Sequence, residues 1–427
     1  MKKCMALITA LVLLLSLGLT SASALAEEQV TLKFWHIWPT DRMAQIVDDY
    51  IAIYEAEHPN IHIESSAYQE VDYQTQKLPI ACSTKSQGDV FFCWGGGAAK
   101  TYVDAGAVLK LDDYLAKYNV YDEILDGTLT YGTYDGGVYG LPLKQWAGVL
   151  FCNQELFDEY GVAIPTTWDE MMTAVETFRA NGVTPLVLGA KDAWHIGMIQ
   201  NALAVRTAGP DYVNAALSGE ATMNTEEIVR SAQLLVDLNN AGAFCNGTLG
   251  VSSEEAQEEF YMGMVAMYFG GSWCASGCDS PDNDLVGKVT VAPLPVVEGG
   301  KGDETTYSGG VIDFMMVNAA TEHPDEAFDF ALGMTKYMSQ ECYKIGDSLP
   351  AWKLGEIDET EVSPTLIAIK DLIQNSTGYV LAWDTFLAGA AIDAHYQALQ
   401  GLIAGTMTPE EFAVAMDEAV VAMYAQD

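Results

Sequence analysis

Basic residues are scarce in this sequence of 427 residues. Lysine and arginine together number 20 against 59 aspartates and glutamates, so the formal net charge at pH 7 is −39. Such a charge repels phosphate backbones and anionic headgroups, which excludes nucleic acid and anionic membrane surfaces as expected partners. An acidic, well-solvated surface is typical of a soluble exported protein, and a neutral ligand fits this composition best.

Cysteine and histidine are also few. Eight cysteines are too sparse in a chain of this length to replace a hydrophobic core with a disulfide framework. Cys4 lies in the N-terminal leader, which leaves an odd number in the rest of the chain and therefore at least one free thiol. Cys274 and Cys278 are close enough in sequence to form a bridge or to stay free. The six histidines are scattered, so no metal site is expected.

Only the N-terminal leader contains a long apolar run, and that run is too short to span a bilayer. Two lysines precede an apolar segment over residues 5–19, and an A-x-A-like cleavage site ends at Ala26. This pattern predicts a secretory signal peptide at residues 1–26. A lipoprotein carries its cysteine after the apolar run, whereas Cys4 precedes it. We expect export across the cytoplasmic membrane to the periplasm or cell envelope, with no lipid-anchor motif.

Phosphate-binding loops are absent as well. Neither G-x-G-x-x-G nor a glycine-rich loop ending in Lys-Ser or Lys-Thr occurs, so no nucleotide cofactor is expected, nor any other. The triple glycine at residues 95–97 indicates either a turn or a close approach of the backbone to another group.

The chain contains a regular alternation of predicted strands and helices. Predicted strands at 30–34, 61–63 and 89–94 are separated by helices with apolar periodicity over 41–54 and 72–83. This alternation predicts an α/β protein with a mostly parallel sheet covered by helices. The residues that follow the leader exceed what one hydrophobic core usually serves, so two lobes are expected.

The stretch 136–157 is the most informative part of the chain. It reads G-G-V-Y-G-L-P-L-K-Q-W-A-G-V-L-F-C-N-Q-E-L-F, two strand pieces around a break at Lys144-Gln145-Trp146. Pro142 cannot donate to a central ladder, so the break fits a chain that crosses from one compact body to another. A hairpin with a decorated turn fits the local pattern equally well. At a crossing, Lys144 and Trp146 would offer a sugar a hydrogen-bond donor and a flat apolar face.

Aromatic and polar residues follow the predicted strands of the first part of the chain. In open α/β sheets ligands bind at the carboxyl ends of the strands. The candidates for ligand binding there are Trp35, His36, Trp38, Asp41 and Trp94. Asp41 is also a candidate helix cap, and at least one of Trp35 and Trp38 is expected to pack in the core.

Several segments, taken in order, resemble a known family. They are T-L-K-F-W-H-I-W, D-V-F-F-C-W-G-G-G, the stretch 136–157 followed by P-T-T-W-D-E, and M-Y-F-G-G-S-W. They are similar to the extracellular solute-binding proteins of carbohydrate ABC transporters, family 1, of the maltose/oligosaccharide-binding type. The resemblance covers the chain beyond the leader, and the missing lipid-attachment cysteine is its departure.

The resemblance implies a two-lobed periplasmic-binding-protein fold of type II-like topology, with each lobe a sheet flanked by helices. Such a protein holds a carbohydrate in the cleft, closes by a hinge at the crossing segments and delivers it to the membrane permease subunits. It catalyses nothing, and a monomer is expected. We place lobe 1 at 27–142 plus 296–348 and lobe 2 at 143–295 plus 349–427, with further crossings near 307–317 and 348–351.

The second part of the chain supplies the remaining ligand-binding candidates. The resemblance gives Trp273 a position under a sugar ring. Trp194 either forms a wall of the cleft or packs within its helix's surroundings. Asp313 is either a ligand acceptor or a structural carboxylate whose hydrogen bonds are satisfied within the protein. The amides of Gly309 and Gly310 are expected to be free for hydroxyl groups. The set is Lys144, Trp146, Trp194, His195, Trp273, Gly309, Gly310, Asp313, Trp383 and Asp384.

Two rival functions stay open on sequence alone. An exported glycoside hydrolase also uses acidic and aromatic residues, although nothing marks two carboxylates as a facing pair. A related binding protein for a non-sugar solute would need several cleft carboxylates for a polyamine or a histidine and cysteine cluster for a metal. Elsewhere, Thr167 and Glu170 predict a capping box, which makes Trp168 structural.

Overall fold

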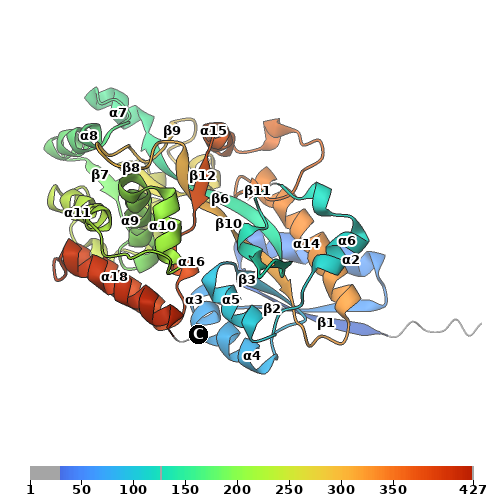
Figure 1. Ribbon diagram of the computed structural model, residues 1–427. Coiled ribbons are helices and arrows are strands. Elements are labelled where there is room, and N and C mark those ends of the chain that lie inside the picture. Colours follow the sequence, from blue (N-terminus) through green and yellow to red (C-terminus); the bar gives the residue numbers. More distant parts are fainter. Residues whose placement is uncertain (1–28, 126, 426–427) are drawn as a thin grey trace, which may run out of the picture.

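The computed structural model describes residues 29–125 and 127–425, and the predicted signal peptide lies outside them. Figure 1 shows two α/β lobes side by side, with β6 and β10 running between them. Within the described ranges no helix combines the length and apolar character needed to cross a membrane.

The strands form one mixed sheet in the order β2-β1-β3-β10-β6-β8-β7. β1 pairs in parallel with β2 and β3, and β7 with β8, whereas every pair made by β6 is antiparallel. The sheet is thus mixed where parallel pairs were expected to dominate, because the chain passes between the lobes in both directions. Its strands are β1 (Val30–His36), β2 (Ile61–Ala67), β3 (Val90–Trp94), β6 (Gly140–Asn153), β7 (Thr184–Val187), β8 (Val265–Gly271), β9 (Val289–Ala292), β10 (Thr306–Val317), β11 (Leu349–Pro350) and β12 (Gly378–Val380). A separate pair joins β4 (Thr133–Tyr134) and β5 (Gly137–Val138).

Helices cover the sheet of each lobe (Figure 1). The first lobe carries α2 (Asp41–Glu57), α3 (Glu70–Asp72), α4 (Leu78–Thr84), α5 (Gly97–Asp104), α6 (Asp112–Tyr118) and α14 (Pro324–Lys344). The second carries α7 (Gln154–Tyr160), α8 (Trp168–Ala180), α9 (Ala193–Ala208), α10 (Pro210–Leu217), α11 (Glu226–Asn240), α12 (Ser253–Tyr261), α13 (Ala275–Cys278), α15 (Pro364–Ile373), α16 (Trp383–Phe386), α17 (Ala390–Ala404) and α18 (Pro409–Tyr424). A π-helical turn, Tyr73–Lys77, joins α3 to α4.

The start of α8 shows how local sequence sets a boundary. The Thr167 side chain accepts from the Glu170 amide while the Glu170 carboxylate accepts from the Thr167 amide, so the predicted capping box is confirmed. Trp168 is buried in the core of the second lobe, which agrees with a structural role.

Separate hydrophobic cores hold the two lobes. One contains Phe34, Phe91 and Phe314, with Leu141 at the start of β6. The other contains Leu150, further along the same strand, and a smaller cluster lies around Phe260 and Tyr268. Because each lobe buries its own apolar side chains, each is able to move as a rigid unit about the segments that join them.

β6 is one continuous strand of 14 residues, so the predicted break in the stretch 136–157 is wrong. Its first part pairs with β10 in the first lobe and its last part with β8 and β9 in the second. The irregularity lies in the partner: the register shifts between Asp313 and Phe314, where Phe314 faces Pro142. The crossing is present, and the hairpin alternative is not.

Three segments cross between the lobes: β6, β10 and β11. β11 pairs with β6 at Gln145 and Lys144, and β10 pairs with β3 of the first lobe and with β12 of the second. The packing moves two of the expected boundaries. Val297, expected in the first lobe, lies in the core of the second lobe, and Thr306 pairs with Gly378 of β12. Trp352, expected in the second lobe, lies in the core of the first lobe. We therefore propose lobes of 29–142 plus 311–352 and 143–310 plus 353–425.

The triple glycine brings the lobes into contact. A Cβ atom at Gly97 would overlap the carbonyl oxygen of Phe386, and one at Gly96 would lie 2.9 Å from that of Thr385. Both carbonyls belong to α16 of the second lobe, whereas the glycines open α5 of the first. The expected close approach of the backbone is therefore an approach of one lobe to the other.

Candidate ligand-binding site

A cavity of about 410 Å³ lies between the lobes. The first lobe contributes the segment 69–72 at the start of α3, which faces the second lobe in Figure 1. The second lobe contributes Asp192, Trp194, Ser253, Glu254, Gln257, Tyr268 and Trp273.

Two tryptophans form the aromatic wall of this cavity. Trp273 follows β8 in a single helical turn, and its ring folds back over Gly271, where any Cβ atom would overlap it. Trp194 lies in the first turn of α9, and the two ring centroids are 6.4 Å apart in an edge arrangement. Both rings are partly exposed. Val71, which is 69% exposed, lies on the first-lobe side of the same cavity.

Trp146 stands behind this wall. Its ring centroid is 5.3 Å from that of Trp273, only 6% of the residue is exposed, and its indole nitrogen has no hydrogen-bond partner. The crossing strand therefore supports the aromatic wall from inside the second lobe.

Polar contacts fix the second-lobe side. The Asp192 carboxylate accepts from the amide and the hydroxyl of Ser253, at 2.7 and 2.9 Å, which ties the start of α9 to α12. Gln257 donates to the Cys274 sulfur at 3.0 Å. Cys274 and Cys278 are both buried free thiols, so the possible bridge between them is not formed.

Lys144 lies where the three crossing segments meet. Its Nζ is 2.9 Å from Asp347, just before β11, and 4.0 Å from Asp313 on β10, and its side chain is 16% exposed. Burial alone would lower the pKa of Lys144, but the carboxylates of Asp347 and Asp313 raise it above its usual range. Burial raises the pKa of Asp313 to about 6, an effect that Lys144 opposes and Asp347 reinforces. Asp313 thus acts as a structural carboxylate.

Glu70 lies on the first-lobe side of the cavity. Loss of solvation and then the charges of Asp313 and Asp384 raise the pKa of Glu70 to about 7, against the opposing effect of Lys144. Asp384 is partly exposed, accepts from the Tyr396 hydroxyl at 2.9 Å and has a pKa raised by burial.

The aromatic candidates from the first lobe lie outside the cavity lining: Trp35, His36, Trp38 and Trp94. His36 is buried and its Nε2 lies 2.9 Å from the Ser65 hydroxyl, while burial lowers its pKa to about 4. Trp94 is buried against Phe92. Ligand contact by His36 and Trp94 is therefore wrong.

Trp35 and Trp38 are partly exposed and stay predictions. The Trp35 ring packs against Tyr68 beneath Lys77, and that of Trp38 packs edge-on against Phe92. Thr40, not Asp41, occupies the cap position of α2, and the side chain of Asp41 lies outside those described.

Two second-lobe candidates belong to the core. His195 is fully buried, accepting from the Gly189 amide at Nδ1 and bonding the Phe269 carbonyl at Nε2. Trp383 is fully buried against His395 and Phe412. Both predicted ligand contacts are wrong because neither ring reaches the cavity.

Gly309 and Gly310 are buried in the sheet, opposite Ala147 and Trp146 of β6. A Cβ atom at Gly309 would overlap the Trp146 carbonyl oxygen. The glycines let two crossing strands approach each other, and the expectation that their amides are free for hydroxyl groups stays a prediction.

Most of the lining was not predicted from the sequence: Gln69, Glu70, Val71, Asp72, Asp192, Ser253, Glu254, Gln257 and Tyr268. The segment 69–72 follows the carboxyl end of β2, so the rule that pointed to the end of β1 also pointed here. The residues on α12 had no such signal, because only the fold brings that helix to the cavity.

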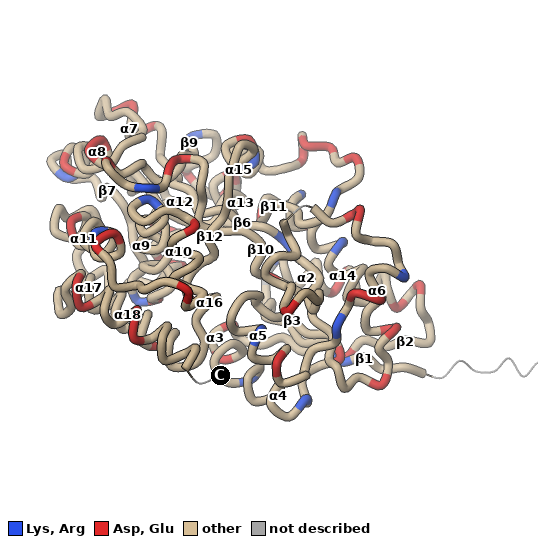
Figure 2. The backbone as a smooth tube through the Cα atoms, in the orientation of Figure 1, with Lys and Arg blue, Asp and Glu red and all other residues tan. Residues whose placement is uncertain are grey.

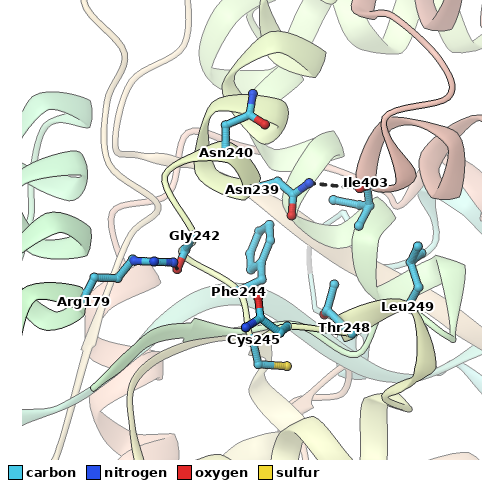
Figure 3. A pocket seen from close by; sticks show the side chains of 11 residues that line it. Arg179, Asn239, Asn240, Gly242, Phe244, Cys245, Thr248, Leu249 and Ile403 are labelled. Atoms are coloured by element: carbon cyan, nitrogen blue, oxygen red, sulfur yellow. Dashed lines mark hydrogen bonds between the residues drawn. The ribbon is translucent and has the colours of Figure 1, made fainter. Parts of the chain in front are cut away.

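A second cavity, of about 350 Å³, lies wholly within the second lobe (Figure 3). Two of its polar side chains are bonded to backbone: Arg179 donates to the Gly242 carbonyl and Asn239 to the Ile403 carbonyl, each at 3.0 Å. It receives no residue from the first lobe, so closure of one lobe on the other would not enclose it.

Known proteins share both this sequence pattern and this fold. An uncharacterised ABC transporter extracellular-binding protein of Pyrococcus horikoshii is 27% identical over 345 residues, which cover 78% of this chain and 75% of that protein. A solved structure from work on xylan utilisation by Caldanaerobius polysaccharolyticus is 38% identical, with a TM-score of 0.87, over 91% of this chain and 99% of that one. A chitin oligosaccharide binding protein is 26% identical, with a TM-score of 0.86, over 93% of this chain and 99% of that one.

These likenesses assign the fold to the periplasmic binding proteins. The family profile for the bacterial extracellular solute-binding proteins matches residues 38–339, the greater part of the described chain. The chain therefore belongs to the bacterial extracellular solute-binding proteins.

Proposed function

We propose that the chain captures an oligosaccharide in the cavity between its lobes, closes over it by a hinge at β6, β10 and β11, and presents it to an ABC permease. Members of this family bind solutes and do not catalyse, so the exported glycoside hydrolase is set aside. Of the similar proteins, one comes from work on xylan utilisation and one binds chitin oligosaccharides, which favours a carbohydrate over a metal or a polyamine.

One observation carries the proposal: the partly exposed rings of Trp194 and Trp273 line one side of the cavity and Val71 the other. A sugar ring has an apolar C–H face and hydroxyl groups at its edge. The Gln257 amide and the surrounding carboxylates offer donors and acceptors for those hydroxyls.

A thermal-shift screen of oligosaccharides tests the proposal. A true ligand raises the unfolding midpoint by mass action, and isothermal calorimetry should then give one site for each chain. Hydrolysis of the bound sugar at low protein concentration, or no midpoint shift with any sugar, would contradict it.

The partner and location are part of the same proposal. We infer membrane permease subunits as the partner and a monomeric chain in the periplasm or cell envelope as the working form. The family supports association with an ABC transporter.

Replacing Gly97 by alanine is expected to disfavour closure without unfolding either lobe. Gly97 begins a helix, where alanine is tolerated, but the added methyl would meet the carbonyl of Phe386 on the other lobe. We expect roughly tenfold weaker sugar binding and a larger radius of gyration by X-ray scattering. Gly250→Ala is the control, because nothing lies within 4 Å of that position; equal effects in both variants would refute the contact.

Sugar binding is expected to tighten as the pH falls. Opening would take Glu70 away from Asp384, so its pKa of about 7 should return toward 4.5. The closed form then holds this proton more tightly than the open form, and closure loses that advantage as pH rises through about 7. Calorimetry should give roughly tenfold tighter binding at pH 6 than at pH 8. Glu70→Gln should flatten the profile; an unchanged slope in that variant would contradict the assignment.

A further inference from the structure

We propose that the cavity between the lobes accepts uncharged and amino-bearing sugars and rejects sugars that carry a carboxylate. This inference rests on the proposed function, because it concerns the class of sugar that the same site admits. The carboxylates that surround the cavity on both lobes provide the discrimination.

The lining is acidic on both sides. Glu70 and Asp72 come from the first lobe, Asp192 and Glu254 from the second, and no lysine, arginine or histidine is among the lining residues. A sphere of the cavity's volume, about 410 Å³, has a radius of roughly 5 Å, so a charge inside it interacts strongly with these groups.

Two of the nearby cations are already engaged. Lys144 is held by Asp347 and Asp313, at 2.9 and 4.0 Å, at the crossing segments. Lys77 lies over the rings of Trp35 and Tyr68, with its Nζ 4.7 and 5.1 Å from the centroids. Recruiting Lys144 to a ligand carboxylate would strip partly buried aspartates of their partner, which is costly.

Glu70 reports the local electrostatic potential. Crowding and the charges of Asp313 and Asp384 already disfavour the ionised form of this carboxyl group. A carboxylate on a sugar bound beside it would bring the same charge into the same field. Narrow clefts with low-dielectric walls concentrate such fields, and Figure 2 shows acidic residues spread over both lobes.

The opposite charge suits this site. An ammonium group would be attracted by the carboxylates and by the faces of Trp194 and Trp273. Hydroxyl groups carry no net charge and need only hydrogen-bond partners. A neutral sugar therefore loses no binding free energy to charge repulsion by the carboxylates.

Calorimetry with matched sugars tests the inference. Xylotetraose is compared with the same tetraose bearing a glucuronic acid branch, and tetra-N-acetylchitotetraose with its deacetylated tetra-amine. We expect the acid form to bind at least roughly thirtyfold more weakly than its neutral parent, and the amine at least as tightly as its parent. Raising the salt concentration from about 0.02 M to about 0.5 M should narrow the acid-to-neutral difference.

Glu254→Gln should reduce the acid-to-neutral ratio several-fold, because it removes one lining charge. Glu258→Gln is the control, since Glu258 is also exposed and lies one turn further along the same helix, outside the lining. Equal affinities for acidic and neutral sugars would overturn this inference and leave the proposed function standing. Absence of binding by every sugar would overturn the proposed function, and this inference with it.

Discussion

Trp273→Ala is expected to weaken sugar binding at least tenfold while the protein stays folded. The partly exposed indole presents a flat face to the cavity, and a stacking contact in a desolvated site contributes about 1 to 2 kcal/mol. The loss should exceed that of a single contact, because Trp194 and Trp146 both pack against this ring.

Calorimetry on the folded variant measures this effect, with circular dichroism to verify folding. Trp273→Phe should recover part of the affinity because it keeps an aromatic face. Trp35→Ala is the matched control: Trp35 is also partly exposed, but it lies within β1, near its end, and outside the cavity lining. Unchanged affinity in Trp273→Ala, or an equal loss in Trp35→Ala, would refute this placement of the site.

Lys144→Met is expected to lower the free energy of unfolding by about 3 to 5 kcal/mol at neutral pH. The substitution leaves Asp347 and Asp313 partly buried without their cation, at the point where all three crossing segments meet. Chemical denaturation measures the difference.

Acidification should restore part of this stability. Asp313 has a pKa of about 6 even beside Lys144, and it should be higher once the lysine is gone. Protonation then removes the unpaired charge, so the defect shrinks as pH falls below that value. Adding Asp347→Asn to the variant should also recover stability.

Lys344→Met is the control for this prediction. Lys344 pairs with Glu341 at 2.6 Å, but its side chain is 36% exposed, so its loss should cost less than about 1 kcal/mol. A similar cost in the two variants would mean that the crossing segments do not depend on the buried pair.

The aromatic wall of the site was predictable, because the neighbours of its two tryptophans in sequence fix their surroundings. Trp273 follows Gly270 and Gly271 at the end of a buried strand, and Trp194 opens a helix after Asp192; both line the cavity. His36 was wrongly predicted to contact the ligand, although the alternation along its strand indicates that it is buried. Two residues apart on a strand, His36 and Phe34 share one face, and that face is buried.

The wrong predictions of ligand contact at His195 and Trp383 could not have been avoided from the sequence pattern. Each occurs beside a partly exposed residue, Trp194 or Asp384, and a shift of one position along a helix turns a side chain from solvent into the core. Likewise, nothing near Glu254 predicts that its helix borders the cavity, because its neighbours there come from distant parts of the chain.

The sequence by itself predicted the export of an acidic α/β protein and determined its main strands and helices. Periodicity and turn chemistry act over a few residues, and these features depend on nothing longer. Only the tertiary structure decided which tryptophans reach the cavity, how Lys144 joins Asp313 and Asp347, and that carboxylates from both lobes surround one space. Those relations join residues far apart in the chain, so they exist only once the two cores have formed and the crossing strands have set one lobe against the other.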